Sequence, residues 1–248
     1  MKLKSLFSKK TQPIPVWFKT DIHNHVIPGI DDGSPDVETS IELITELQTL
    51  GVKRIIASPH IAAVRFPNTP EILAQANAEL QSALRTNGME ISVGYSAEYH
   101  IDENLPEIVE RGELVPYPDN YVLIENQWVQ EPLNLEQMIF DLQIKGYQPI
   151  FAHPERFDYY HKNIKRLDEL HEKIPFQINL LSLAGYYGKE VQKVAEILLK
   201  KGYCDFLGTD AHNMRHIEYL RNYLSTAQAL KHRETSLKTL KNDRTFRV

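Results

Sequence analysis

The chain has 248 residues, of which 42% are hydrophobic and 25% are charged, so it can bury a substantial core in one large α/β domain or two small ones. Its net charge of -5 provides no general attraction to nucleic acid or to acidic membranes, and neither is expected as a partner. The single cysteine, Cys204, excludes an intramolecular disulfide and is typical of a reducing compartment.

Residues 1–16 are predicted to form a basic, flexible N-terminal tail. The tail carries four lysines but lacks the apolar run of a secretory signal, and no later stretch approaches the length of a membrane span. Pro13 and Pro15 separate it from the folded part, which is predicted to be one domain over 17–248. We therefore expect a cytoplasmic protein with no stable membrane insertion.

Along the rest of the chain, short apolar and β-branched runs alternate with longer helical patterns. The first helix is predicted to begin at Ser34, whose hydroxyl would cap it ahead of Pro35, and to end at Gly51. Further helices are predicted at 69–86, 134–145, 161–173, 188–201 and 215–230. The strands are predicted near 19–22, 53–57, 91–95, 121–125, 148–152, 176–180 and 204–208.

This repeated order of strand and helix predicts parallel strands with right-handed crossovers, in a barrel or a doubly wound sheet. Both architectures carry their chemistry at the C-terminal ends of the strands. A closed ring brings all these ends to one mouth, whereas the outer strands of an open sheet lie far apart. We therefore favour an α/β barrel of about seven strands.

Metal-binding side chains recur at the predicted strand ends. His23 and His25 lie two residues apart, so in an extended strand both imidazoles face the same side and can bind one ion. The predicted strand 176–180 ends near Asn179, but the other six end at or next to a His, Asp or Glu: His23 and His25, His60, Glu98, Glu125, His153, and Asp210 with His212. Imidazole and carboxylate ligands without thiolate suit manganese, iron or zinc.

The remaining five histidines lack such neighbours and are interpreted as surface residues: His100, His161, His171, His216 and His232.

The order of these motifs resembles the PHP superfamily of polymerases and histidinol phosphatases. The segments DIHNHVIPGIDDGS (21–34), IIASPH (55–60), LIEN (123–126), FAHPERF (151–157) and GTDAHN (208–213) are most similar to bacterial capsular-polysaccharide-type tyrosine-protein phosphatases. The resemblance implies a distorted seven-stranded β/α barrel that holds three divalent metal ions at the C-terminal ends of its strands. It favours manganese, with iron or zinc as alternatives.

The resemblance also implies a set of ligands for each ion. One ion would bind His23, His25, Glu98 and Asp210, and a second would share Glu98 and bind Glu125 and His153. The third would bind His60, His212 and one of the adjacent pair Asp31 and Asp32. The sequence does not decide between these two aspartates, although Asp32 is preferred.

Arg156 is the best candidate for a catalytic residue that is not a ligand. It lies three residues after His153, where its planar fork could bind phosphate oxygens, although a salt bridge to Glu155 or Asp158 is the alternative. Arg65 and Arg215 are weaker candidates for binding the substrate. A thiol-dependent phosphatase is excluded, because that chemistry needs an arginine six positions after its cysteine and Asp210 occupies this position after Cys204. Cys204 is therefore interpreted as buried and inert.

The resemblance implies a phosphoric monoester hydrolase that cleaves phosphotyrosine with metal-activated water and without a phosphoenzyme. Its expected partner is the tyrosine-rich tail of a bacterial kinase that governs capsule or exopolysaccharide synthesis. Two alternatives stay open: a phosphatase of a small ester such as histidinol phosphate, and a non-enzymatic docking module. A PHP exonuclease is disfavoured, because the sequence shows no basic track for nucleic acid.

Overall fold

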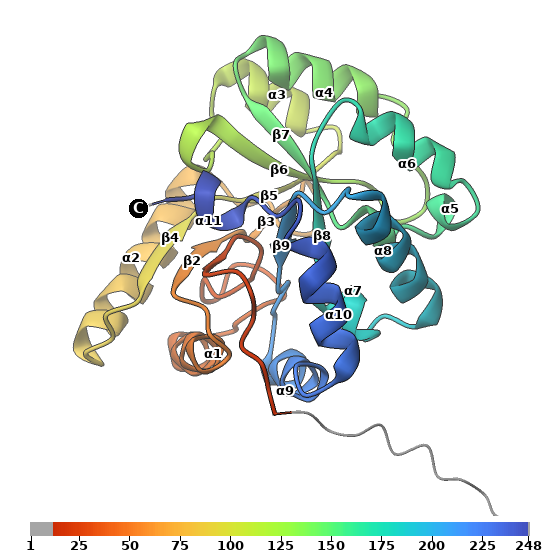
Figure 1. Ribbon diagram of the computed structural model, residues 1–248. Helices are drawn as coiled ribbons and strands as arrows, with labels where there is room; N and C mark the ends of the chain where they lie inside the picture. Colours follow the sequence, from red (N-terminus) through yellow and green to blue (C-terminus); the bar gives the residue numbers. More distant parts are fainter. Residues whose placement is uncertain (1–11, 248) are drawn as a thin grey trace, which may run out of the picture.

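A computed structural model describes residues 12–247, and its nine strands in that range are all parallel (Figure 1). One sheet has the order β1–β2–β4 and the other the order β3–β5–β6–β7–β8–β9. The strands are β1 (Thr20–Asp21), β2 (Arg54–Ala57), β3 (His60–Ile61), β4 (Ser92–Tyr95), β5 (Glu98–His100), β6 (Tyr121–Glu125), β7 (Gln148–Ala152), β8 (Phe176–Asn179) and β9 (Phe206–Gly208).

The two sheets form one curled surface whose edges meet near the C-terminal ends of the strands. The segment after β1 pairs with the segment after β9 through a parallel bridge between Asn24 and Ala211. The amide of Asp210 donates to the carbonyl of His23 at 2.7 Å, and that of His25 donates to Ala211 at 3.0 Å. The C-terminal ends of β1 and β9 therefore lie side by side.

All seven predicted strand positions are confirmed, but the count of seven is not. Two strands continue past the predicted ends as separate short strands, β3 after β2 and β5 after β4. The first break falls at Pro59, which has no amide hydrogen for a sheet ladder. The fold is thus a parallel α/β fold with a curled, half-barrel sheet.

The helices pack on the outside of this sheet. Helix α1 contacts α9 on one side of the sheet, and α3 contacts α4 on another (Figure 1). Asp36, and not the predicted Ser34, caps α1 by accepting a hydrogen bond from the amide of Thr39. The predicted helix 215–230 is two helices, separated at Leu224–Thr226. The helices are α1 (Val37–Thr49), α2 (Pro70–Thr86), α3 (Leu105–Arg111), α4 (Leu135–Ile144), α5 (Asp158–His161), α6 (Ile164–His171), α7 (Leu180–Ala184), α8 (Lys189–Lys201), α9 (Met214–Tyr223), α10 (Ala227–Ser236) and α11 (Asn242–Thr245), with short 3-10 turns at Pro118–Asn120 and Pro154–Arg156.

Packing begins slightly before the boundary predicted at residue 17. The amide of Ile14 donates to the carbonyl of Leu224 at 3.0 Å, and that of Val16 donates to Leu50 at 2.8 Å. Most of the predicted tail, residues 1–11, lies outside the described residues.

The C-terminal segment closes the end of the curled sheet opposite the strand ends discussed above. Phe246 is fully buried in the interior apolar cluster, against Tyr117, Tyr121 and Phe206. The side chain of Asn242 donates to the carbonyls of Thr20 and Leu207 at 2.9 and 2.7 Å. The C-terminal segment therefore packs against the interior at this end of the sheet.

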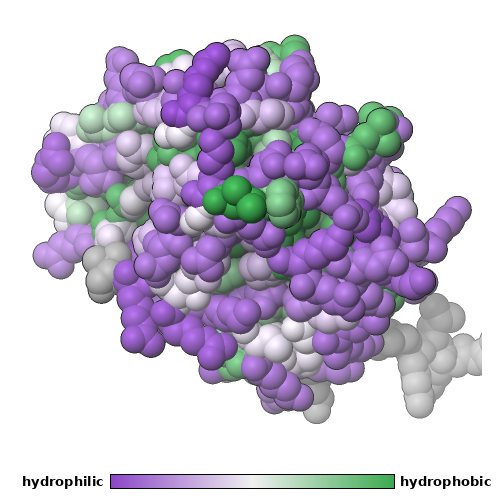
Figure 2. Space-filling view, turned by 90° about the horizontal axis from the view of Figure 1, so that it is seen from above, coloured by the Kyte–Doolittle hydropathy of each residue, from purple (hydrophilic) through white to green (hydrophobic). Residues whose placement is uncertain are grey.

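The surface seen from the top of Figure 1 is largely hydrophilic, with small separate hydrophobic areas (Figure 2). Two of the exposed apolar side chains of the molecule, Phe140 and Ile144, lie on α4. Scattered apolar residues of this kind are normal on a protein surface. None of the helices in residues 12–247 combines the length and apolarity that crossing a bilayer requires.

Truncating Phe246 should destabilise the whole domain. Phe246→Ala would leave a cavity between the first residues of several strands, and we expect a loss of about 3–5 kcal/mol in the free energy of unfolding. Urea denaturation measures this loss. Phe140→Ala, at a position 56% exposed, is the matched control and should change the midpoint little. Equal effects of the two substitutions would contradict the role assigned to the C-terminal segment.

Candidate metal centre

Glu98, on the buried strand β5, is the central carboxylate of a cluster of imidazoles. Its Oε2 lies 3.1 Å from His23 Nε2 and 3.2 Å from His60 Nδ1, and its Oε1 lies 3.0 Å from His153 Nε2. These three histidines come from three different strand ends. One carboxylate thus connects residues far apart in the sequence.

Asp210, which follows β9, is the second carboxylate around which histidines gather. Its Oδ1 lies 3.5 Å from His23 Nε2, 3.4 Å from His25 Nε2 and 3.5 Å from His212 Nδ1. The two imidazoles of the His-x-His motif therefore face one carboxylate, as the alternation of side chains in an extended segment predicts.

The adjacent aspartates Asp31 and Asp32 contact different partners. Asp32 Oδ1 lies 3.5 Å from the Nε2 atoms of both His60 and His212. Asp31 is buried instead against His25, with its Oδ2 2.7 Å from Nδ1, and it accepts hydrogen bonds from the amides of Gly33 and His60. Of the two, Asp32 lies with the histidines that the third ion would need.

Glu125 completes the cluster at the end of β6. Its carboxylate lies 3.5 Å from His153 Nε2 and 3.9 Å from His60 Nδ1. All nine predicted ligands thus come together. They fall into four overlapping groups whose ligand atoms lie within 4.8 Å of one another: His25, Asp32, His60 and His212; His23, Glu98 and His153; His23, His25 and Asp210; and His60, Glu98 and Glu125.

The chemistry of these residues fits divalent metal ions. Three of the carboxylates, Glu98, Glu125 and Asp210, are buried together, which is unfavourable without nearby positive charge. Among the described residues, His25 Nε2 and Glu125 Oε1 are buried atoms without a hydrogen-bond partner. Imidazole nitrogen and carboxylate oxygen are the ligands that divalent transition metals prefer when thiolate is absent.

The ionisation of the carboxylates depends on their neighbours. Burial alone would raise the pKa of Glu98, but the imidazoles of His23 and His60 hold that pKa well below its usual range. Burial raises the pKa of Glu125 well above its usual range, and the negative charge of Glu98 raises it further. The protein alone therefore does not balance the charge of Glu125, and a cation would.

Side chains outside the ligand set orient the imidazoles. Gln177 Oε1 lies 2.7 Å from His23 Nδ1, and Asp31 occupies the same position on His25. The Nδ1 atom of His212 lies 2.9 Å from the carbonyl oxygen of Asp210. Such contacts fix the ring and direct the other nitrogen, Nε2, toward the centre of the cluster.

At several of these positions the backbone has an unfavourable conformation or lies very close to a neighbouring segment. His153 and Asp210 have φ angles of 29° and 53°, which are uncommon outside glycine. A Cβ at Gly208 would lie 2.4 Å from the Cβ of His23, and a Cβ at Gly33 would lie 2.2 Å from the carbonyl oxygen of His25. Glycine is therefore required on both sides of the His-x-His segment.

Arg156 lies beside the cluster, with its Nη1 2.8 Å from Asp210 Oδ2. Its guanidinium packs over the rings of Trp128 and Tyr187, at 4.6 and 4.1 Å from their centroids. Tyr187 also donates a hydrogen bond to Asp210 Oδ2 at 3.0 Å. The structure gives Arg156 no pairing with Glu155 or Asp158, the alternative considered from the sequence.

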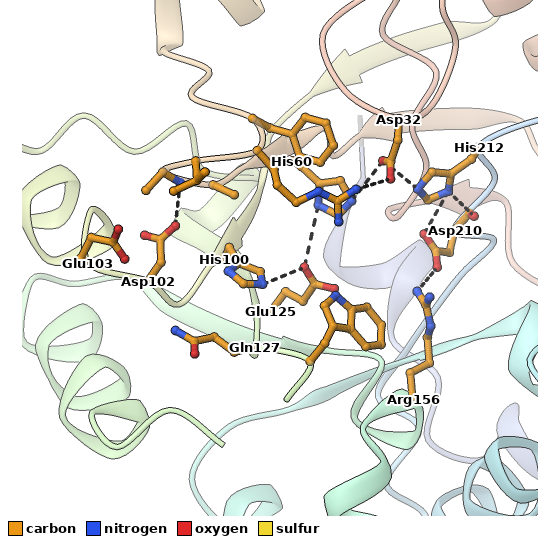
Figure 3. Close-up of a pocket in the computed structure, with 16 residues that line it drawn as sticks. Asp32, His60, His100, Asp102, Glu103, Glu125, Gln127, Arg156, Asp210 and His212 are labelled. Atoms are coloured by element: carbon orange, nitrogen blue, oxygen red, sulfur yellow. Dashed lines mark hydrogen bonds and ion pairs between the residues drawn. The ribbon is translucent and has the colours of Figure 1, made fainter. Parts of the chain in front are cut away.

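A pocket of about 480 Å³ opens over the cluster (Figure 3). Asp32, Asp210, His212 and Arg156 lie at one side of it, Asp102 and Glu103 at the other, and His100 and Glu125 between them. Arg65 lines this pocket, and its Nη2 lies 3.6 Å from Asp32 Oδ2. Arg215 is exposed and does not line the pocket, so its predicted contact with substrate gains no support.

The surface interpretation is wrong for two of the five remaining histidines, His216 and His232, while the other three are partly exposed. His100 lines the pocket, and its position two residues after Glu98 on one strand could have indicated this. His216 is buried and its Nδ1 lies 3.2 Å from the carbonyl oxygen of Asp210, while His232 is buried against Tyr223. By contrast, the prediction that Cys204 is buried is confirmed.

The sequence is similar to those of known bacterial phosphatases. Tyrosine-protein phosphatase YwqE of Bacillus subtilis is 34% identical over 197 residues, which cover 79% of this chain and 78% of YwqE. The putative tyrosine-protein phosphatase CapC of Staphylococcus aureus is 30% identical over 215 residues, covering 85% of this chain and 84% of CapC.

This chain also resembles two solved structures. A chain from the crystal structures of YwqE from Bacillus subtilis and CpsB from Streptococcus pneumoniae, described as metal-dependent tyrosine phosphatases, superposes with a TM-score of 0.76 at 30% identity, covering 92% of this chain and 97% of that one. Histidinol phosphate phosphatase from Lactococcus lactis superposes with a TM-score of 0.53 at 17% identity, covering 83% and 92%, a likeness that concerns the fold alone.

The family described as capsular polysaccharide synthesis, CpsB/CapC, matches residues 19–233, which include every strand and all nine predicted ligands. The chain belongs to the CpsB/CapC family of capsular polysaccharide synthesis.

Proposed function

We propose that this protein is a metal-dependent protein-tyrosine phosphatase that hydrolyses phosphotyrosine. The observation that carries the proposal is the buried cluster of nine imidazole and carboxylate side chains beneath one open pocket, in a chain whose relatives are named tyrosine-protein phosphatases. An intact cluster of this kind argues against a purely docking role, because burying so many ionisable groups is costly.

We propose three ion sites within the cluster. The first is formed by His23, His25, Glu98 and Asp210, the second by Glu98, Glu125 and His153, and the third by Asp32, His60 and His212. Manganese is the preferred ion, with iron or zinc as alternatives. When bound, clustered divalent ions activate water and neutralise the charge that develops on the phosphoryl group.

The other residues of the pocket would bind and orient the phosphate. The guanidinium of Arg156 lies next to the cluster and is held between two aromatic rings, so it can offer its planar fork to phosphate oxygens without losing much side-chain entropy. Arg65 is exposed, lines the same pocket next to Asp32, and would add a weaker contact. No residue here is arranged as a thiol nucleophile, since Cys204 is buried and burial raises the pKa of its thiol well above the usual range.

The proposed partner is the phosphorylated tail of a bacterial tyrosine kinase that regulates capsule or exopolysaccharide synthesis. Membership of the capsular polysaccharide synthesis family supports this partner. The proposed location is the cytoplasm, which the single free cysteine supports.

A comparison of two substrates tests the reaction. Purified manganese-loaded protein should hydrolyse a phosphotyrosine peptide with a kcat/KM at least about tenfold above that for histidinol phosphate. Release of inorganic phosphate measures both rates. Preference for histidinol phosphate would favour the small-ester alternative, and turnover as negligible as that of Asp210→Ala despite bound metal would favour the docking module.

Removing the metal should abolish activity. We expect a chelator to reduce turnover to background, manganese to restore it, and elemental analysis of the active protein to find about three ions per chain. Asp210→Ala should lower the metal content, because this carboxylate faces both His23 and His25. Asp158→Ala, at an exposed position outside the cluster, is the control and should retain full metal content. Active protein with far fewer ions would contradict the proposed sites.

Replacing Arg156 should slow the reaction without removing metal. In Arg156→Lys the amine keeps the charge but loses the planar fork, and we expect kcat/KM to fall by about a hundredfold. Steady-state kinetics on a phosphotyrosine peptide, with metal analysis of the same sample, measures this. Arg215→Lys, outside the pocket, should match the unmodified protein. A similar loss in both variants would contradict the role of Arg156.

A further inference from the structure

Large apolar side chains are exposed in the lining of the pocket and directly beside it in the sequence. Val64 is 85% exposed and Trp128 is 44% exposed, and both line the pocket, while Val129 follows Trp128 and is 90% exposed. We call Val64, Trp128 and Val129 the apolar lips. Burying either exposed valine side chain against a partner would be favourable, because it would remove apolar surface from water. Exposed apolar groups gathered at a functional pocket are typical of a surface that binds a partner.

The apolar lips belong to two loops, which follow β3 and β6 on either side of β5, and both loops are held in place. The loop that carries Val64 follows β3 and is closed by paired backbone hydrogen bonds between Ala62 and Phe66, at 2.9 and 3.1 Å. Asp102 fixes the same loop by accepting from the amide of Ala63 at 2.7 Å. The valine side chain is therefore presented on a defined backbone.

The second loop follows β6 and is fixed from both sides. The Gln127 side chain donates to the carbonyl of Ile101 at 3.1 Å, and the hydroxyl of Tyr159 donates to the carbonyl of Gln127 at 3.0 Å. Trp128 stacks on His153, with ring centroids 6.0 Å apart, and packs at a tilt against Phe157, with centroids 5.2 Å apart. A surface ordered in advance loses little entropy when it binds.

The space between the lips suits an aromatic phosphate ester. Phe66 stacks on His60 at 5.2 Å, and Trp128 stacks on His153, so aromatic rings flank two of the imidazoles around Glu98. Both rings line the pocket that leads to the cluster. A tyrosine side chain whose phosphate lies at the cluster would have to leave the pocket through the mouth, where its backbone would meet the lips.

We propose that Val64 and Val129 bind apolar side chains next to the phosphotyrosine of a polypeptide substrate, and so select a polypeptide segment over a free small ester. This inference rests on the phosphotyrosine phosphatase activity proposed above. A small ester in the pocket leaves Val129, which does not line it, and most of Val64 uncovered, whereas a chain that continues on both sides of the tyrosine covers them. The partner is therefore a phosphotyrosine flanked by apolar residues.

The test uses the full chain, loaded with manganese, and three synthetic substrates. Two are phosphotyrosine peptides that differ only in the residues flanking the phosphotyrosine, leucine in one and serine in the other, and the third is free phosphotyrosine. We expect kcat/KM for the leucine peptide to exceed that for the serine peptide by about tenfold. The double variant Val64→Ser with Val129→Ser should lose this preference, which is a ratio of two rates of the same protein and so does not depend on its basal activity.

Ile144→Ser is the matched control, since Ile144 is 70% exposed on α4 and does not line the pocket. It should keep the preference for the leucine peptide. Equal rates of the unmodified protein on the two peptides, or a preference that survives in the double variant, would overturn the inference but leave the phosphatase activity standing. Failure of the loaded protein to hydrolyse any of the three substrates would overturn the proposed activity and the inference with it.

Discussion

The structure depends on an electrostatic constraint at the C-terminal ends of its strands, where Glu98, Glu125 and Asp210 are buried side by side. Buried carboxylates repel one another strongly in a medium of low dielectric, so their positions are tolerable only with cationic or imidazole partners at close range. The imidazoles supply part of this compensation, which is why the pKa of Glu98 falls although it is buried, while that of Glu125 rises. Divalent cations bound among these carboxylates would supply the remaining compensation.

The fold holds these carboxylates in place by joining the strand ends to one another. The curled sheet is bridged between Asn24 and Ala211, which brings the first and last strand ends together. Such closeness needs Gly208 beside His23, and it forces Asp210 into a backbone conformation that costs free energy. Burial of Phe246 at the other end contributes stability that can offset this strain.

The sequence predicted the parts of the molecule that follow from local rules. Strands such as 121–125 and 148–152 were predictable because each contains a continuous apolar run, and ligands such as His60 and His153 because they follow such runs. The roles of Gln177 and Tyr187 were not predictable, since both act through contacts with residues more than twenty positions away. His216 was misjudged for the same reason, because its burial depends on how α9 packs and not on its own neighbours in sequence.

Asp31 and Asp32 show why local sequence rules do not predict every residue of a site. The two residues have the same chemistry and adjacent positions, and only the turn that carries them separates their roles. Gly33 lets the chain pass against His25, so that Asp31 is directed inward to the Nδ1 atom of that ring and Asp32 outward to His60 and His212. Asp31 also accepts from the amide of His60, which ties this turn to the start of β3. A ligand and the residue that orients a ligand are thus distinguished by backbone geometry, which a pattern of residue types does not contain.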